Sequence, residues 1–160
     1  MPTPTYTPLA NITLGSSASS VTFSSIPATY RDLVYVISGQ LVSASPTNTL
    51  LRFNGDSGNN YTRVYVFSNS SSPSSAVETG ISGANPWFAT NEISNGIGTI
   101  MDYSATDKHK TMLARYNGVS SGILMSATRW ANTAAITSMA FSNTNNFAAG
   151  TTFSIYGIAS

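Results

Sequence analysis

The 160-residue chain contains no cysteine, and only 8% of its residues are charged. The lack of cysteine excludes disulfides and cysteine-ligated metals. Seven Lys and Arg residues against six Asp and Glu residues give a net charge of +1, and these charges are scattered along the sequence. No basic surface is therefore expected that would hold a phosphate backbone, so we predict no nucleic-acid partner.

Long apolar runs are also missing. The longest such runs cover about five to seven residues, whereas a membrane-spanning helix needs roughly twenty. The first ten residues, MPTPTYTPLA, contain neither the basic region nor the apolar region of a signal peptide. We therefore expect neither membrane insertion nor an N-terminal leader.

Glutamate, lysine and glutamine, which favour exposed helix positions, are almost absent, while 60 of the 160 residues are serine, threonine or asparagine. This composition is typical of a β protein with a neutral surface rich in hydroxyl groups. Such a surface is suited to close packing against neighbouring subunits.

The pattern along the chain is one of short strands separated by turn residues. Residues 31–43, RDLVYVISGQLVS, form the longest candidate strand, and apolar residues on both of its faces indicate a central position in a sheet. About nine or ten such segments, with no helical periodicity, predict an all-β fold, an antiparallel β-sandwich for which a jelly roll fits the strand count best. We expect one domain over residues 11–160, with a long irregular loop at residues 69–96.

Two turns have distinct signals. Asn117–Gly118 predicts a hairpin, because both residue types tolerate positive φ. In LLRFNGDSGNNY, residues 50–61, Asn54–Gly55 likewise predicts a hairpin between two strands. The alternating oxygen donors of the same stretch leave a calcium site open as an alternative, although a single carboxylate, Asp56, is fewer than such a loop normally supplies.

We find no pattern that predicts catalysis, a cofactor or a metal centre. His109 is the only histidine, and it lies in the short segment DKHK between two strands. A triad would need a serine and an orienting carboxylate beside it, and no spacing in the sequence supplies them. The six acidic residues fall mostly at turns and strand ends, which does not favour the paired carboxylates of a polysaccharide depolymerase.

The two tryptophans lead to different expectations. Trp130 ends a predicted strand, so we assign it to the core or its rim. Trp87, together with Phe88, lies in the irregular segment NPWF, where exposed aromatic residues are typical of protein interfaces. We therefore predict Trp87 and Phe88 as interface residues.

Several stretches resemble a group of small virion proteins of tailed bacteriophages, common in aquatic phages. They are LANITLGSSASSVTFSSIPATYRDLVYVISG, RFNGDSGNNY, a tryptophan followed by AITSMAF, and FAAGTTFSIYGI. The resemblance covers residues 9–158. It implies a jelly-roll-like domain on the particle surface, often a homotrimer used in capsid decoration or in fibres, and it implies no catalytic residue.

On this resemblance, residues 1–10 are expected to form an extended N-terminal arm, because three prolines in eight residues oppose a helix. Tyr6 and Leu9 would then contact a neighbouring subunit or the shell. The expected function is that of a non-enzymatic decoration or cement protein on the virion, with the major capsid protein or another virion protein as partner. The alternative is a receptor-binding or carbohydrate-binding module of a tail fibre, which would read a host-surface glycan through residues 69–96 and the turns at 54–60 and 143–147.

Overall fold

The computed structural model describes residues 5–68, 72–118 and 122–159, and these ranges form strands and turns without a helix. The strands are β1 (Tyr6–Thr13), β2 (Ala18–Phe23), β3 (Asp32–Gly39), β4 (Thr47–Asn48), β5 (Leu50–Phe53), β6 (Tyr61–Ser68), β7 (Pro73–Ile81), β8 (Phe88–Ala89), β9 (Ser94–Met101), β10 (Lys110–Gly118), β11 (Gly122–Trp130), β12 (Met139–Phe147) and β13 (Thr152–Ile158). The part of the chain that the structure describes offers no helix long and apolar enough to cross a membrane.

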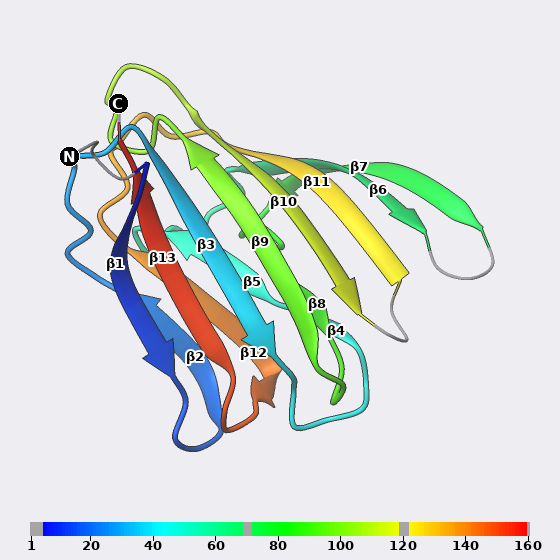
Figure 1. The fold of residues 1–160 in the computed structure, drawn as a ribbon. Helices are drawn as coiled ribbons and strands as arrows, with labels where there is room; N and C mark the ends of the chain where they lie inside the picture. Colours follow the sequence, from blue (N-terminus) through cyan, green and yellow to red (C-terminus); the bar gives the residue numbers. More distant parts are fainter. Residues whose placement is uncertain (1–4, 69–71, 119–121, 160) are drawn as a thin grey trace.

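Eleven of these strands form two antiparallel sheets that face each other, and β4 and β8 pair in a separate two-stranded sheet. Eight strands make the larger sheet in the order β1-β13-β3-β9-β10-β11-β6-β7, and three make the smaller sheet in the order β2-β12-β5. The chain passes from one sheet to the other repeatedly, as between β11, β12 and β13, which is the jelly-roll type of connection. Figure 1 shows the smaller sheet behind the larger one, with β6 and β7 extending beyond it. The predicted antiparallel β-sandwich is confirmed.

An aromatic core joins the two sheets. Tyr35 from β3 and Phe153 from β13 both contact Phe141 from β12, with ring centroids 5.5 Å apart in each pair. Further along, Phe53 of the smaller sheet packs on Trp130 of the larger one at the same centroid distance. Trp130 is buried, so its predicted place in the core is confirmed. Burial of such large rings supplies much of the hydrophobic stabilisation of a sandwich.

The glycines of β9 leave room for two of these rings. A Cβ atom at Gly98 would overlap the ring of Tyr35, and one at Gly96 would lie 3.1 Å from Cδ1 of Trp87. Both glycines face the core. The segment NGIG therefore lets two large aromatic side chains pack directly on the backbone of the sheet.

The expected N-terminal arm is wrong for the residues that the structure describes. Tyr6–Thr13 is strand β1, which pairs with β13 along its whole length and has a bulge between Pro8 and Ala10. Proline lacks a donor, but an edge strand tolerates it because one side of that strand faces solvent. Residues 1–4 lie outside the described residues.

The irregular loop expected at residues 69–96 is also wrong for about half of its length. It contains β7, β8 and the start of β9, while residues 69–71 lie outside the described residues. Strand β7 is the edge strand beside β6, and seven of its nine residues are exposed. An edge strand that is open to solvent on both faces needs no alternation of apolar and polar residues, so its sequence carries no strand period.

The turn predicted at Asn54–Gly55 is confirmed, with φ values of 52° and 70°. The flanking strands do not form a hairpin, however, because β5 pairs with β12 in the smaller sheet and β6 pairs with β11 in the larger sheet. The turn carries the chain from one sheet to the other. By contrast, β10 and β11 do pair directly with each other, with Gly118 opposite Gly122. The turn predicted at Asn117–Gly118 is wrong in its position, because both residues belong to β10, and residues 119–121 lie outside the described residues.

Candidate functional site: the outer face of the larger sheet

The turn at residues 54–60 is held together by the carboxylate of Asp56. One oxygen accepts hydrogen bonds from Trp130 Nε1 at 2.7 Å and from Asn60 Nδ2 at 2.9 Å, and the other accepts one from the Gly58 backbone N–H at 2.9 Å. These donors satisfy the carboxylate. Arg52, the nearby cation in the sequence, donates to the Ser82 carbonyl oxygen at 3.0 Å.

These contacts give the turn a structural role. In the described ranges no group of three or more His, Cys, Asp or Glu side chains is placed to hold a metal ion. The hydroxyl of Tyr61 accepts a bond from the Phe53 N–H at 3.0 Å, and burial raises the pKa of Tyr61 to about 12, so this hydroxyl stays protonated. The turn thus anchors β5, β6 and β11 to one another.

A pH-dependent stability follows from the same contacts. The Trp130 indole N–H, followed by Asn60 and Gly58, holds the pKa of the Asp56 carboxyl below its ordinary value, although partial burial opposes the shift. A lowered folded-state pKa adds stability that is present above the unfolded pKa near 3.9 and is lost as the pH falls through the folded value.

We expect Asp56→Asn to lower the free energy of unfolding by about 2 kcal/mol at pH 7, because it weakens charge-assisted hydrogen bonds. The difference from the wild type should shrink as the pH falls below 4, which urea unfolding at several pH values will measure. Asp107→Asn is the matched control, since Asp107 is an exposed turn residue. A pH-independent difference would contradict this account of the Asp56 carboxylate.

The single histidine and the lysine beside it lie at the start of β10. His109 is exposed in the turn before β10. Lys110 beside it is buried, and its ammonium group donates to the carbonyl oxygens of Lys108 at 2.8 Å and Thr133 at 3.1 Å. Burial lowers the pKa of Lys110. These bonds tie the β10 start to the segment after β11, which is a structural task.

The structure corrects the interface prediction for Trp87. Its side chain is fully buried, stacks on Phe147 with ring centroids 6.2 Å apart, and donates from Nε1 to Ser94 Oγ at 3.0 Å. The surrounding segment is irregular because it folds across the inner side of the larger sheet, where Ala84 exchanges two backbone hydrogen bonds with Leu51. Trp87 is a core residue.

The other three interface candidates differ from one another. Leu9 is partly buried and packs against the core, so it is not a free contact residue. Phe88 lies in β8, and its side chain lies outside the described residues. Tyr6 is 56% exposed at the start of β1. Among the candidates whose side chains the structure describes, only Tyr6 is therefore exposed enough for a partner to reach it.

The larger sheet has a second apolar side, which faces away from β2, β12 and β5. Because side chains alternate along a strand, the residues between the core positions of β3, β6, β7, β9, β10 and β11 all point there. We call eight apolar members of this set the outer face: Val36, Val64, Val66, Val77, Ile97, Leu113, Ile123 and Met125. Six of them are about half exposed or more, from 48% for Leu113 to 64% for Val77. Val34, which is buried, Met101 and Ala127 lie on the same side.

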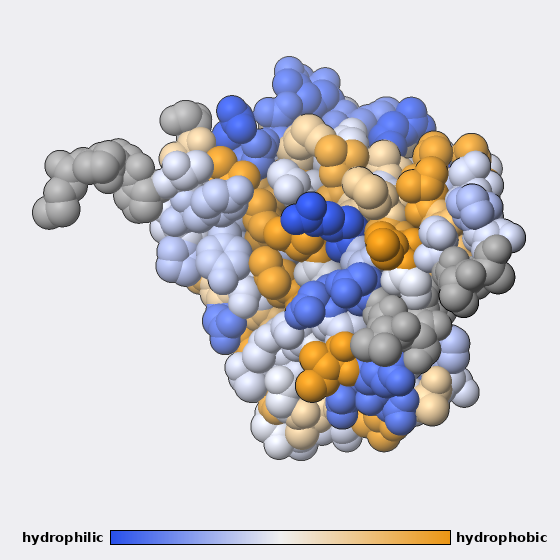
Figure 2. All heavy atoms as spheres, turned by 45° about the vertical axis from the view of Figure 1, so that its right-hand side comes forward, coloured by the Kyte–Doolittle hydropathy of each residue, from blue (hydrophilic) through white to orange (hydrophobic). Residues whose placement is uncertain are grey.

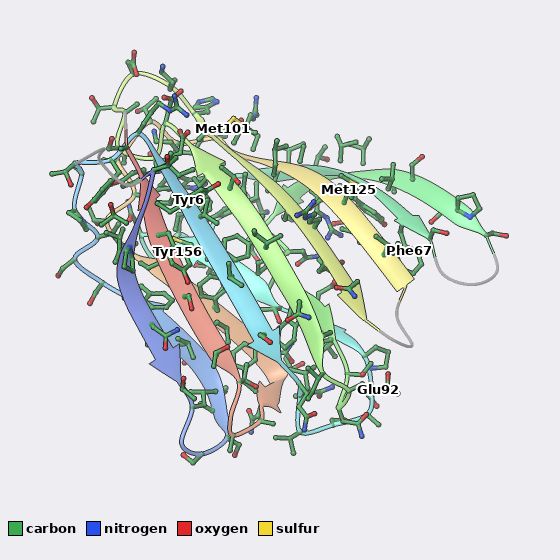
Figure 3. All side chains as sticks on the ribbon, viewed as in Figure 1. Tyr6, Phe67, Glu92, Met101, Met125 and Tyr156 are labelled. Carbon is green, nitrogen blue, oxygen red and sulfur yellow. The ribbon has the colours of Figure 1, made fainter. Side chains whose placement is uncertain are left out.

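The strand register makes the outer face continuous. Thr99, Leu113, Ala127, Val64 and Val77 lie side by side on five neighbouring strands. Figure 2 shows hydrophobic residues gathered on this side of the molecule around strongly hydrophilic ones. In Figure 3, Met125 lies on β11, while Tyr6 and Tyr156 lie toward the opposite edge of the same sheet.

The outer face is furrowed by three open hollows of about 460 to 530 Å³. Met125 lines two of them, Ile97 lines two, and Ile123 lines two, so the hollows form one connected surface. Tyr6 lines the hollow that also contains Leu113. Exposed apolar surfaces of this extent are typical of sites where another molecule binds.

The charges in the middle of this side are positive, and Asp32 at the start of β3 is buried and paired with Arg31. Arg115 of β10 lies between Ile97 of β9 and Met125 of β11 in the strand register, and it is exposed. Arg129 of β11 is exposed nearer the strand end. Strands β6, β9, β10 and β11 contain no acidic residue, and the Glu78 of β7 points to the other side, where it pairs with Arg63. The outer face is therefore apolar and positively charged.

A polar cleft of about 580 Å³ lies elsewhere, beside the end of β7. Asn48, Asn59, Glu78, Asn85 and Thr144 are among its lining residues. The cleft thus brings together residues from 69–96, from the turn at 54–60 and from residues 143–147, the three segments predicted to form a glycan-reading surface. Residues 143–147 were predicted as a turn, but they are the last part of strand β12. Amide, hydroxyl and carboxylate groups of this kind can bond to sugar hydroxyls.

The comparisons with known proteins place the chain in no family. No protein-family model matches it, and no curated protein matches it either. Among solved structures, it is similar to the galectin LEC-6 of Caenorhabditis elegans, with 8% identity, 94% of this chain and 96% of the galectin covered, and a TM-score of 0.38. It is also similar to a mutant of the alginate lyase Aly36B in complex with an alginate tetrasaccharide, with 7% identity, coverage of 94% and 79%, and a TM-score of 0.31. Because both TM-scores are below 0.5, we assign the β-sandwich from the strands and strand pairings of this chain alone.

Proposed function

We propose that the chain is a non-enzymatic structural protein of a bacteriophage virion, a decoration or cement protein that binds the assembled capsid from outside. The resemblance of residues 9–158 to small phage virion proteins supports the virion assignment. The homotrimer and the major capsid protein as partner are part of the same proposal. The single observation that carries it is the outer face, an apolar surface that the chain itself leaves uncovered.

The mechanism requires no chemistry beyond binding. A protein that binds the assembled shell but not its dispersed subunits stabilises the shell by mass action. In a trimer, three outer faces engage together, so weak individual contacts multiply into firm attachment. The neutral, hydroxyl-rich remainder of the surface keeps the attached protein hydrated.

The test is a cryo-electron microscopy map of particles purified from infected host cells, with this chain fitted into the density. Density repeated over the icosahedral shell, with the outer face of the larger sheet turned toward the capsid, is the expected result. Density confined to the tail would overturn capsid decoration. Absence of the chain from the particles would overturn the virion assignment as a whole.

A second candidate function is recognition of a host-surface glycan by a module of the phage tail. The observation that favours it is the polar cleft lined by Asn48, Asn59, Glu78 and Asn85. Binding of the purified chain to immobilised host polysaccharide, lost on Asn59→Ala and kept on Leu113→Glu, would support this function. Equal binding by both variants would exclude the cleft.

A further inference from the structure

Arg115 lies among apolar residues of the outer face. It flanks Ile97 and Met125 in the strand register and lines two of the three hollows. No hydrogen bond or ion pair joins its guanidinium to another residue that the structure describes. A partner that covers the apolar residues must therefore also cover this charge, and an arginine buried without a counter-charge strongly opposes association.

The outer face is poorly suited to bind a second copy of itself. A two-fold interface brings the same surface together from both subunits. Such a contact would bury two copies of Arg115, with Arg129 of each subunit near the rim, and no carboxylate on either side. Like charges facing each other across an interface oppose binding and select against that partner.

The chain also has few carboxylates elsewhere to offer another copy. Four of its six acidic residues are engaged within the molecule: Asp32 with Arg31, Asp56 with Trp130, Glu78 with Arg63 and Asp102 with Lys108. Glu92 also takes part in an interaction within the molecule. Asp107 lies next to Lys108 and His109 in the sequence. The counter-charge for Arg115 is therefore best supplied by a different protein.

We infer that the outer face binds a different protein whose docking surface is apolar and presents an aspartate or glutamate to Arg115. An arginine and a carboxylate form two parallel hydrogen bonds, which fix the orientation of the partner as well as neutralise the charge. The apolar residues around Arg115 exclude water from this pair. This inference rests on the proposed function, because the partner it describes is a protein of the shell.

The probe is a particle from a virus in which the gene for this chain has been deleted, and purified chain is added back. We expect saturable binding of the wild type and at least about a hundredfold weaker binding of Arg115→Glu, because reversal buries two like charges. Arg129→Glu is the matched control with the same change in net charge, and we expect less than about a tenfold effect from it because that residue lies at the rim. Urea unfolding of each variant checks that the fold is intact.

The outcomes separate the inference from the proposed function. No binding of the wild-type chain to these particles would overturn both. Binding that Arg115→Glu leaves unchanged would overturn only the carboxylate partner. A dimer of the chain alone that Leu113→Glu dissociates would identify a second copy as the occupant, and binding to vesicles of phosphatidylcholine and phosphatidylserine that Arg115→Glu abolishes would identify anionic lipid. Either of these last two results would overturn the inference.

On the inner side of the larger sheet, Arg63 Nε, Ser126 Oγ and Thr128 Oγ1 are buried without a hydrogen-bond partner in the part of the chain that is described. Thr128 lies directly opposite Arg63 in the strand register, and Ser126 lies two residues along the same strand face. Nearly all buried polar groups in folded proteins have a partner in protein or in water.

We infer that a buried water molecule links these three groups. The charge of Arg63 is already balanced, since its Nη2 lies 2.8 Å from Glu78 Oε2, so a neutral ligand fits better than an anion. One donor from the guanidinium and two hydroxyls supply the three hydrogen bonds that a buried water typically makes. The water would join β6 to β11 beneath the outer face.

Thr128→Val tests this inference, because valine has nearly the shape of threonine and removes only the hydroxyl. A bridging water predicts a lower urea midpoint for Thr128→Val, whereas an unsatisfied hydroxyl predicts an equal or higher one. Thr62→Val, at an outward position of β6, is the control and should leave the midpoint nearly unchanged. A crystal structure without solvent density between Arg63 Nε and Thr128 Oγ1 would also overturn the inference.

Discussion

Trp87→Ala is expected to lower the free energy of unfolding by about 4 kcal/mol, the usual cost of removing a fully buried tryptophan side chain. The loss combines the apolar area of the ring, its stacking on Phe147 and its hydrogen bond to Ser94. It also leaves a cavity beside Gly96, whose backbone the ring contacts. Because whole domains are stable by only about 5–15 kcal/mol, we expect a measurable unfolded fraction of this variant at 37 °C. Urea unfolding followed by the fluorescence of Trp130 will measure the change in the free energy of unfolding.

Two further variants are compared with Trp87→Ala: one separates the ring from the indole N–H, and the other is a control at an exposed position. Trp87→Phe keeps an aromatic ring against Phe147 and loses the indole N–H, so we expect a smaller loss of about 2 kcal/mol. Tyr6→Ala removes a side chain that is 56% exposed and should change the free energy of unfolding by less than about 1 kcal/mol. If Trp87→Ala instead unfolded like the wild type and failed to bind particles, Trp87 would be a contact residue after all.

The fold class could be predicted from the sequence because its signals are local. Alternation and turn residues locate strands. Apolar residues on both faces of residues 31–43 correctly indicated a central strand, since β3 lies between β13 and β9, but that strand ends at Gly39 and residues 40–43 lie beyond it. Asn54 and Gly55 adopt the positive φ values that their residue types favour. Pairing partners are not local, however, and the turn at Asn54–Gly55 was compatible with both a hairpin and a crossing between sheets.

The prediction that Trp87 is an interface residue was wrong for a related reason. Residues 82–87 have no strand period, and lack of a period is usual for exposed loops. Here the segment is buried because it covers the part of the larger sheet that the three-stranded sheet does not reach, and backbone bonds to Leu51 and Thr49 satisfy its polar groups. Only the three-dimensional arrangement shows that this part of the larger sheet would otherwise be exposed to solvent.

The outer face had a visible signal that periodicity alone does not resolve. In KTMLARY the two alternating sets are Met112, Ala114 and Tyr116 on one side, and Leu113 with Arg115 on the other. A period of two shows that the sets lie on opposite faces, but it does not say which face meets the second sheet. Apolar residues in both sets of several neighbouring strands were the sign of a sheet with one covered and one uncovered apolar side.

Leu113→Glu is expected to abolish attachment to the particle while leaving the fold intact. Leu113 is near the middle of the outer face, between Thr99 of β9 and Ala127 of β11, and its side chain is 48% exposed. In the free protein a glutamate there stays in water, so the free energy of unfolding should change by less than about 1 kcal/mol. In the bound state the carboxylate would be buried against apolar surface and would also compete for Arg115, so we expect binding at least about a hundredfold weaker.

Val42→Glu is the matched control for this effect. Val42 is 59% exposed, lies outside the strands of the outer face, and lines none of its three hollows. The change in charge and in residue type is comparable, so a general electrostatic effect on binding would weaken both variants alike. Add-back to particles that lack the chain, with bound protein quantified after sedimentation, will measure the ratio. Equal binding of Leu113→Glu and the wild type would mean that the outer face does not contact the shell, and attachment would then have to use another surface of the sandwich.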